Sequence, residues 1–570
     1  MIAKSASTTW VLHPRHAPDR ARAIASALGA PPAFGHVLVN RGVETLEAAQ
    51  RFLDPSLDQL HDPFLLMDLD RAVERVQRAI RDGERILVQG DYDVDGITST
   101  FVLLSTLREL GGRAEYRIPH RTRDGYGLSA GAVDEAARLG STLIVTVDCG
   151  ITAFEAVERG RALGIDTVVT DHHEPGARLP AAIAVVNPRR TDCAYPFKSL
   201  AGVGVTFKLA QALFGVSGRP QQAFGFLDVV ALGTIADVVP LVGENRILAR
   251  LGLERLDGTE RPGLRALIEV AGLSGKRITG GHVAFVLAPR MNAAGRMGNA
   301  EQSLHLLLAR DRGEGLACAE SLEEDNLRRR EFDERVALEA SERVRTELGW
   351  PECSSILLWS ETWHPGVLGI VASRLVERFH RPTVLVALEG SRGRGSGRSV
   401  SGLDLTRVLD GCSDLLEAYG GHAFAAGLTV TRERLPALRE RLEQLVRERL
   451  VPDDYVSKLE IDADLTLQEC DLDLIHWLER AAPHGLDNPE PVFRTQEAIV
   501  ESVQRVGGGR HLRLWVRDAT GVREAIGFGL GEQAGGIAKA RRCALAFIPE
   551  RNDWMGETRI QLRLREVQGL

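Results

Sequence analysis

Short apolar runs rich in β-branched residues alternate with helical segments in the first half of the chain. Such runs, separated by helices like the one expected over 98–110, are typical of a parallel sheet covered on both faces. The expected strands are Ile86–Val88, Ala114–Ile118, Leu143–Asp148, Asp166–Asp171 and Ala182–Asn187. The pattern therefore predicts an α/β fold, in which ligands bind at the carboxyl ends of the strands.

The pattern changes twice further along the chain. A second α/β unit follows residue 350, with strands expected at 355–360 and 382–388. From Leu459 onward, six alternating apolar and polar segments with Gly-rich turns indicate a small β-barrel of the OB type. The predicted domains are a helical lead-in at 1–85, a first α/β domain at 86–319, a connector helix at 320–350, a second α/β domain at 351–450 and the barrel at 455–570.

The connector is expected to be one long polar helix. Apolar residues repeat every four positions from Phe332 to Leu348 on an otherwise charged stretch, and Gly349 and Pro351 end it. A long helix with one narrow apolar stripe suits a link between domains. An ordinary surface helix of one large domain is the alternative.

Composition narrows the class of protein. The 570 residues carry 26% charged and 44% hydrophobic residues with a net charge of -8, which excludes a uniformly basic nucleic-acid binder but not a local basic groove. Seven cysteines without a CxxC pair fit a reducing cytoplasm. The chain has no secretory signal pattern and no apolar run of about 18 residues, so we expect no membrane association.

Three carboxylates follow the first expected strand in the segment GDYDVDG. Asp91, Asp93 and Asp95 occupy alternate positions, and in extended backbone such side chains project to one side. Three anions in one cleft repel one another unless cations bind there. A solvated acidic turn or a calcium loop is the alternative; against the calcium loop, position twelve from Asp91 is Val102 rather than Glu.

Further acidic and imidazole groups follow the later strands. Asp148 ends the third strand, Asp171, His172 and His173 end the fourth, and Asp237 follows within an apolar segment. Strand ends of one parallel sheet share an edge, so these groups are expected to meet. Carboxylates with imidazole suit Mn²⁺ or Mg²⁺, and their number is enough for two ions that act on a phosphoester.

The motifs GDYDVDG, VTVDCGI, TDHHEP and GTIADVVPL, in this order, resemble those of the DHH phosphoesterase superfamily. Within it, they are most similar to the bacterial RecJ-type exonucleases. The likeness extends to IPHRTRDGYGLS, APRMNAAGRMGNA, WHPGVLGIVASRL and YGGHAFAAGLTV, and so covers nearly the whole chain. It implies a DHH domain at 86–319, a DHH-associated domain at 351–450 and a nucleic-acid-binding OB fold at 455–570.

The resemblance also implies roles for individual residues. His173 would contact the scissile phosphate or help to protonate the leaving group, and Asp171 would orient the neighbouring ligands. Gln89 stands where pyrophosphatases of the superfamily have a histidine, which favours the nuclease branch. The implied ligands of two divalent ions, Mn²⁺ or Mg²⁺, are Asp93, Asp95, Asp148, His172 and Asp237, with Asp91 in the same motif.

Basic and Gly-rich segments are candidates for substrate binding. Arg121 and Arg296 resemble a pocket for a terminal phosphate; unspecific surface arginines are the alternative for these two and for Arg290. In the second α/β domain, Gly-rich backbone lies beside basic residues, and the candidates there are Arg394, Arg398, Gly420, Gly421 and His422.

The barrel segment carries basic residues around Trp515, a combination that can hold a single strand, although Trp515 itself is expected to be core. The resemblance implies a single-stranded-DNA-specific 5′→3′ exonuclease of DNA repair and recombination that releases 5′-mononucleotides. Its partners would be single-stranded DNA, a single-stranded-DNA-binding protein and a helicase. The alternatives are a phosphodiesterase for short oligonucleotides or cyclic dinucleotides, and a non-catalytic replication factor.

Overall fold

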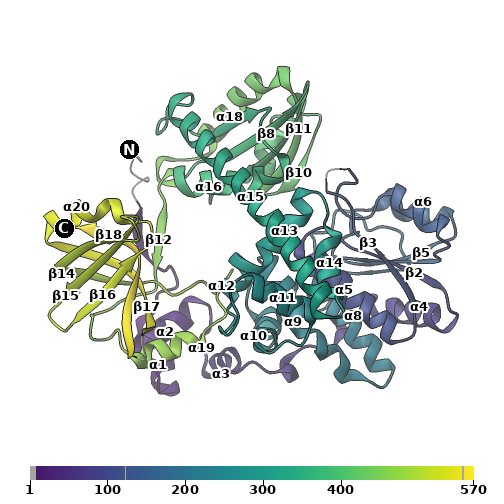
Figure 1. The fold of residues 1–570 in the computed structure, drawn as a ribbon, viewed down its shortest axis with the longest axis horizontal. Coiled ribbons are helices and arrows are strands. Elements are labelled where there is room, and N and C mark those ends of the chain that lie inside the picture. Colours follow the sequence, from purple (N-terminus) through teal and green to yellow (C-terminus); the bar gives the residue numbers. More distant parts are fainter. Residues whose placement is uncertain (1–7, 122, 555–556) are drawn as a thin grey trace. The chain divides into compact units, whose positions relative to one another are not determined.

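The computed structural model describes residues 8–121, 123–554 and 557–570, which form two compact units. The larger unit comprises Val11–Gly295, Ala300–Glu320 and Glu460–Leu570. The smaller unit is built mainly from Ser321–Leu459 and includes Arg296–Asn299. Each unit is described by itself (Figure 1).

The larger unit contains the parallel sheet that the apolar runs predict. Its strands are ordered β3-β2-β4-β5-β6, and every neighbouring pair is parallel. The chain leaves β2 toward β3 and then returns to the other side of β2 with β4, so the order reverses between β2 and β4. Ligands bind at such a switch point, beyond the carboxyl ends of the strands. The strands are β2 (Arg85–Gln89), β3 (Arg113–Arg117), β4 (Leu143–Val147), β5 (Asp166–Thr170) and β6 (Ala184–Val186).

Helices pack on both faces of this sheet (Figure 1). Helices α6 and α7 bury apolar residues against Leu87 and Ile144 of the sheet. Helices α4, α5 and α8 contact strands on the other face, and α8 and α9 also pack on α5. The helices of this part are α4 (Leu69–Arg81), α5 (Val94–Glu109), α6 (Ala130–Arg138), α7 (Phe154–Ala162), α8 (Gly202–Val216), α9 (Leu227–Ala236), α10 (Gly243–Asp257), α11 (Pro262–Val270), α12 (Gly280–His282), α13 (Ala288–Met297) and α14 (Glu301–Leu308).

The smaller unit is the second α/β fold, with a mixed sheet ordered β10-β11-β9-β8-β7. The expected long helix is α15 (Arg312–Thr346). Its apolar stripe is buried: Val336, Ala340 and Val344 share a core with α16 and the sheet. The other elements are β7 (Ile356–Ser360), α16 (Leu368–Phe379), β8 (Thr383–Glu389), β9 (Arg392–Arg398), α17 (Leu405–Asp410), β10 (Ala418–His422), β11 (Ala425–Thr431) and α18 (Leu435–Arg449).

The C-terminal part of the larger unit is the predicted OB-type barrel. Strand β14 pairs with both β15 and β17, and this second pairing closes the sheet on itself. The elements are β13 (Ala463–Asp464), α19 (Leu472–Arg480), β14 (Phe493–Val506), β15 (His511–Arg517), β16 (Val522–Gly527), α20 (Ala534–Ala540), β17 (Arg542–Trp554) and β18 (Glu557–Gly569). The first expected strand is split: β13 is preceded by β12 (Lys458–Ile461), which pairs with β1 (Thr9–Leu12).

Helices from the start of the chain complete the barrel's core. Phe34 and Leu38 pack in the same apolar cluster as Phe493 and Leu514 of the barrel. These helices are α1 (Pro18–Leu28), α2 (Pro32–Asn40) and α3 (Leu46–Leu53). The barrel and the helices α1 to α3 are therefore one packed body.

Arg246 of α10 ties the barrel to the part of the unit that carries the parallel sheet. Its buried guanidinium donates to the carbonyls of Phe52 and Ala481, both at 2.8 Å. Within the described ranges, none of the helices has the length and apolar character needed to cross a membrane.

Candidate metal centre

The sequence-predicted carboxylates and histidines gather at the carboxyl edge of the parallel sheet, on both sides of the switch point. The expectation that Asp91, Asp93 and Asp95 follow one another in extended backbone is wrong. Helix α5 begins at Val94, Asp93 is its N-cap and accepts from the Gly96 N–H at 3.1 Å, and Asp95 lies in its first turn. A tight helix start, rather than strand alternation, brings the three carboxylates together.

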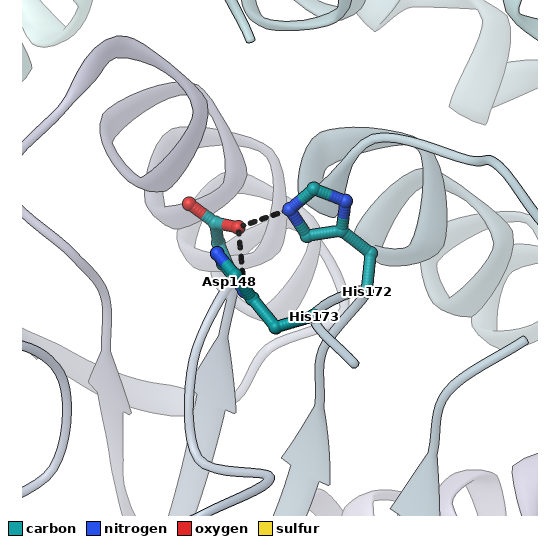
Figure 2. A group of neighbouring side chains, drawn as sticks. All are labelled: Asp148, His172 and His173. Atoms are coloured by element: carbon teal, nitrogen blue, oxygen red, sulfur yellow. Dashed lines mark ion pairs between the residues drawn. The ribbon is translucent and has the colours of Figure 1, made fainter. Parts of the chain in front are cut away.

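His172 is the centre of the cluster. Its Nε2 lies 3.1 Å from Asp148 Oδ1, 3.6 Å from Asp237 Oδ2 and 3.9 Å from Asp95 Oδ2. Figure 2 shows Asp148 facing both His172 and His173 across the ends of two neighbouring strands. The Nδ1 of His172 lies 3.1 Å from the carbonyl oxygen of Leu200. Since Nδ1–H donates there, Nε2 turns a lone pair toward the carboxylates.

Several atoms that face one another in this cluster are acceptors to which no described residue donates. Asp91 Oδ1, Asp148 Oδ1, Asp237 Oδ2 and His172 Nε2 are buried, and none has a hydrogen-bond partner among the described residues. Buried polar atoms are normally paired, so a group of such acceptors needs a cation. Three overlapping ligand sets have atoms within 4.8 Å of one another: Asp148, His172 and His173; Asp95, His172 and Asp237; and Asp91, Asp93 and Asp148. The residues thus fit divalent metal ions.

The pKa shifts of these groups also fit a site for cations. Burial and the charge of Asp93 raise the pKa of Asp95 to about 7. Burial and neighbouring carboxylates hold the pKa of Asp148 and of Asp237 well above its usual range. Burial and the nearby His173 lower the pKa of His172 to about 3, so this imidazole is neutral and can act as a ligand.

Asp171 has a different environment. Its Oδ1 accepts from the backbone N–H groups of His172 and His173 and lies 2.8 Å from His173 Nδ1. Its Oδ2 accepts from the Ile151 N–H at 2.9 Å. Burial acts to raise the pKa of Asp171, but the hydrogen bond and charge of His173 outweigh it and hold that pKa below its usual value. Asp171 is therefore an ionised residue that orients His173.

His173 stands at the open side of the cluster. Its side chain is 35% exposed, and its Nδ1 lies 3.0 Å from the hydroxyl of Tyr126, which also donates to the carbonyl of Asp148. Burial acts to lower the pKa of His173, but the hydrogen bond and charge of Asp171 outweigh it and raise that pKa. A protonated imidazole can donate to a phosphate oxygen or to a leaving group.

Several residues that hold the site carry no signal in the sequence. The backbone N–H groups of Gly202 and Val203, in the first turn of α8, both donate to the Asp95 carboxylate at 2.7 Å. Asn292 Oδ1 accepts from the Val94 N–H at 3.1 Å, and Asn187 Nδ2 donates to the His173 carbonyl at 2.8 Å. The sequence does not reveal these backbone donors and single amide side chains, because only the tertiary structure brings them to the site. The segment APRMNAAGRMGNA, noted for its resemblance, was the one available hint for Asn292.

The predicted substrate-binding residues fall in both units. Arg121 lies in the larger unit, with its guanidinium 5.0 Å from the ring centroid of Tyr92 within GDYDVDG. Arg296 lies in the smaller unit and donates to the carbonyl of Gly366 at 3.1 Å. In the smaller unit's sheet, β11 separates β9 from the edge strand β10, so Arg398 and His422 are both opposite Ala425. This sheet also carries Arg394, Gly420 and Gly421.

The expectation that Trp515 is core is wrong. Its side chain is 38% exposed, because β15 turns Leu512, Leu514 and Val516 inward and the residues between them outward. The outward row contains His511, Arg513, Trp515 and Arg517. Phe528, 61% exposed, packs edge-on against His511 with 5.3 Å between ring centroids. We call these five residues the β15 row.

Comparison with known families matches three parts of the chain. The DHH family N-terminal domain matches residues 85–234, the DHHA1 domain matches 353–448, and the RecJ OB domain matches 461–566.

Individual relatives match over nearly the whole chain. The single-stranded-DNA-specific exonuclease RecJ of Escherichia coli (strain K12) is 37% identical over 563 residues, which is 94% of this chain and 96% of that protein. The protein of the same name from Bacillus subtilis (strain 168) is 37% identical over 552 residues, 96% of this chain and 69% of that protein. The crystal structure of RecJ in complex with Mn²⁺ from Thermus thermophilus has a TM-score of 0.84 and 32% identity, and covers 98% of this chain and 79% of that one.

Proposed function

Since the chain belongs to the RecJ family, we propose that it is a single-stranded-DNA-specific exonuclease that degrades the strand from its 5′ end to 5′-mononucleotides. The observation that supports this most is the group of buried acceptor atoms around His172, to which no described residue donates a hydrogen bond. Such a centre can bind the two divalent cations that phosphodiester hydrolysis uses. The proposed setting is DNA repair and recombination in the cytoplasm, where the free cysteines remain reduced.

The proposed metal ligands are those whose acceptor atoms face one another in the cluster. Asp95 keeps its orientation because both of its oxygens accept from the start of α8. Two divalent ions, when bound, supply an activated water and offset the charge of the transferred phosphate. The proposed set is Asp93, Asp95, Asp148, His172 and Asp237, with Asp91 completing it through its donor-free oxygen.

His173 is the proposed catalytic residue beside the ions, with Asp171 holding it. The Asp171 carboxylate lies 2.8 Å from Nδ1 of His173 and fixes that side of the ring, which leaves Nε2 as the nitrogen for the substrate. In that position the imidazolium can donate a proton to the leaving oxygen or a hydrogen bond to the scissile phosphate.

Arginines and Gly-rich backbone are proposed to hold the substrate's phosphates. Arg121, whose guanidinium lies over the Tyr92 ring in the larger unit, is proposed to bind the 5′ phosphate, because a guanidinium can pair with it through two hydrogen bonds. Arg296 of the smaller unit is proposed as a separate phosphate contact. The other proposed phosphate contacts come from the smaller unit's sheet: Arg394, Arg398, Gly420, Gly421 and His422.

The barrel is proposed to bind the strand at the β15 row. Aromatic faces stack on bases without regard to sequence, and arginines neutralise phosphates. Arg517 is paired with Glu501 at 2.8 Å and Arg513 with Glu524, so both arginines of the row are charge-balanced in the free protein and would exchange these partners for phosphates. A single-stranded-DNA-binding protein and a helicase are the proposed partners, because a single-strand exonuclease needs another protein to supply its strand.

End-labelled DNA tests the proposed function. A 5′-labelled 30-mer should release labelled mononucleotide at once in Mn²⁺ or Mg²⁺, whereas a 3′-labelled 30-mer should shorten gradually. A blunt duplex of the same sequence should resist, and a chelator should stop both reactions. Endonucleolytic fragments, or equal cleavage of the duplex, would contradict the proposal.

Two variants of matched chemistry control this test. Asp93 and Asp471 are both helix N-caps whose carboxylate accepts a backbone N–H, at 3.1 and 2.8 Å. Asp93→Asn should lose about 100-fold or more in rate, because it removes a metal-binding charge, while Asp471→Asn in α19 should retain activity. Equal activity of the two variants would remove Asp93 from the site.

A further inference from the structure

One valine beside the metal centre holds a backbone conformation that valine rarely adopts. Val238 directly follows Asp237 at the end of α9, and its φ is 59°. A β-branched side chain is strained in the left-handed region, and helices that end there usually carry glycine. Among the described residues, the other non-glycine positions with positive φ are not β-branched: Asp68, Asp148, His380, Asp487 and Arg541.

The fold fixes the chain on both sides of Val238. The Asp237 N–H donates to the Gly233 carbonyl at 3.0 Å, and Val239 is buried. The Leu241 N–H donates to the Leu486 carbonyl at 2.8 Å. The backbone must therefore turn at residue 238, which accounts for the conformation but not for a valine in it.

The side chain of Val238 gains little from the fold. It is 68% exposed, so it buries little apolar surface in return for the strain. Glycine adopts the same turn without a Cβ, and asparagine tolerates it better than valine does. Strained residues cluster at functional sites, where the side chain has a use outside the fold. Here the neighbouring residue is Asp237, whose Oδ2 lies 3.6 Å from His172 Nε2.

We propose that Val238 is a substrate-contacting residue whose isopropyl group packs on the sugar of the nucleotide at the scissile phosphate. The inference rests on the proposed function, because it takes the substrate to be a nucleic-acid strand at this centre. The phosphate is drawn to the cations that the Asp237 cluster binds, and the nearest apolar surface on a nucleotide is the carbon face of its sugar. An exposed isopropyl group beside Asp237 is complementary to that face.

The test separates loss of a substrate contact at residue 238 from a change in the stability of the fold. Val238→Gly removes the isopropyl group and relaxes the backbone, so its Tm should equal or exceed that of the wild type. Its kcat/KM on a single-stranded 20-mer should fall about fivefold or more, because an apolar contact of this size contributes at least that much to discrimination. Val238→Ile keeps a β-branched apolar group and should retain activity. Hydrolysis of bis(p-nitrophenyl) phosphate, which has no sugar, should be equal in the wild type and in Val238→Gly.

His380→Gly is the matched control. His380, in the smaller unit, ends α16 with a φ of 51°, so the change relaxes the same kind of turn at a residue that is not part of the metal cluster, and kcat/KM should stay within about twofold. Val238→Gly with wild-type kcat/KM on the 20-mer would overturn the inference, as would a loss accompanied by a lower Tm or by weaker Mn²⁺ dependence. A wild type that leaves the 20-mer intact would instead contradict the proposed function.

Discussion

At the scale of single residues, the three consecutive residues Asp171, His172 and His173 have different environments and therefore different proposed roles. The Asp171 carboxylate accepts hydrogen bonds from the backbone N–H groups of Ile151, His172 and His173 and contacts the His173 ring, so Asp171 is a positioning residue. His172 presents a neutral Nε2 to the carboxylates, and His173 faces the opening with a raised pKa. In the proposed reaction, this tripeptide would supply a carboxylate that orients, a metal ligand and a proton donor.

Asp171→Asn tests this division. The amide keeps the size of the side chain but removes the charge that raises the pKa of His173, so less of that imidazole is protonated at a given pH. If His173 donates a proton, kcat should fall about 100-fold near neutrality, and the alkaline limb of the pH–rate profile should move to lower pH. The concentration of Mn²⁺ at half-maximal rate should change little.

The pH–rate profile is measured together with Tm for wild type and variant. An unchanged alkaline limb would contradict the role of His173 as proton donor. A large rise in the Mn²⁺ requirement would instead place Asp171 among the ligands.

At the scale of elements, the start of α8 acts as part of the metal centre. A Cβ on Gly202 would lie 2.4 Å from Asp148 Oδ1, which is too close for any side chain. Gly202 thus allows the helix N-terminus to reach Asp95 and Asp148 together. Helix α5 acts in the same way, because its first turn carries Asp95 and its N-cap is Asp93.

Gly202→Ala should therefore lower activity by about 100-fold, because the Asp148 carboxylate must shift. Gly215→Ala, near the other end of α8, is the matched control: its Cβ would meet nothing within 4 Å. Alanine is preferred to glycine inside a helix, so the control should be more stable by about 0.5–1 kcal/mol and fully active. Rates and thermal unfolding of both variants check this, and an active Gly202→Ala would show that the site tolerates the shift.

The strands of the parallel sheet could be predicted from the sequence, whereas the start of α5 and the backbone donors of α8 could not. Buried parallel strands reveal themselves as continuous β-branched runs, so all five strands and the Asp and His residues after them could be predicted. The start of α5 could not, because DYDVDG has the alternation of an extended chain as well as the N-cap of a helix. Backbone donors such as Gly202 and Val203 carry no signal because their role depends on the tertiary fold, and the barrel's alternation did not decide which way Trp515 faces.

At the scale of the molecule, the barrel shares its core with the N-terminal helices, and this decides how its role can be tested. Removing the residues after about 452 would expose Phe34 and Leu38, which pack against Phe493 and Leu514. A truncated chain would therefore lose stability as well as any binding surface. Changes confined to the surface of the barrel are the appropriate test.

Trp515→Ala and Phe528→Ala, combined, should weaken binding of a long single strand about 30-fold or more, because stacking on each aromatic side chain contributes about 1–3 kcal/mol per base. Cleavage of bis(p-nitrophenyl) phosphate, which carries no base to stack on these side chains, should be unaffected. Val522→Ala, at another exposed apolar position of the barrel, is the control. Fluorescence anisotropy across a salt series measures the affinity, and unchanged binding would assign the barrel a structural role.

The most direct measurement is an anomalous difference map from crystals grown with Mn²⁺. The central claim is that the buried acceptors around His172 bind divalent cations. Two peaks are expected within coordination distance of this cluster, shared among Asp91, Asp93, Asp95, Asp148, His172 and Asp237, and Asp148→Asn should lose at least one of them. A map without a peak at the cluster, with Mn²⁺ bound elsewhere on the chain, would contradict the claim.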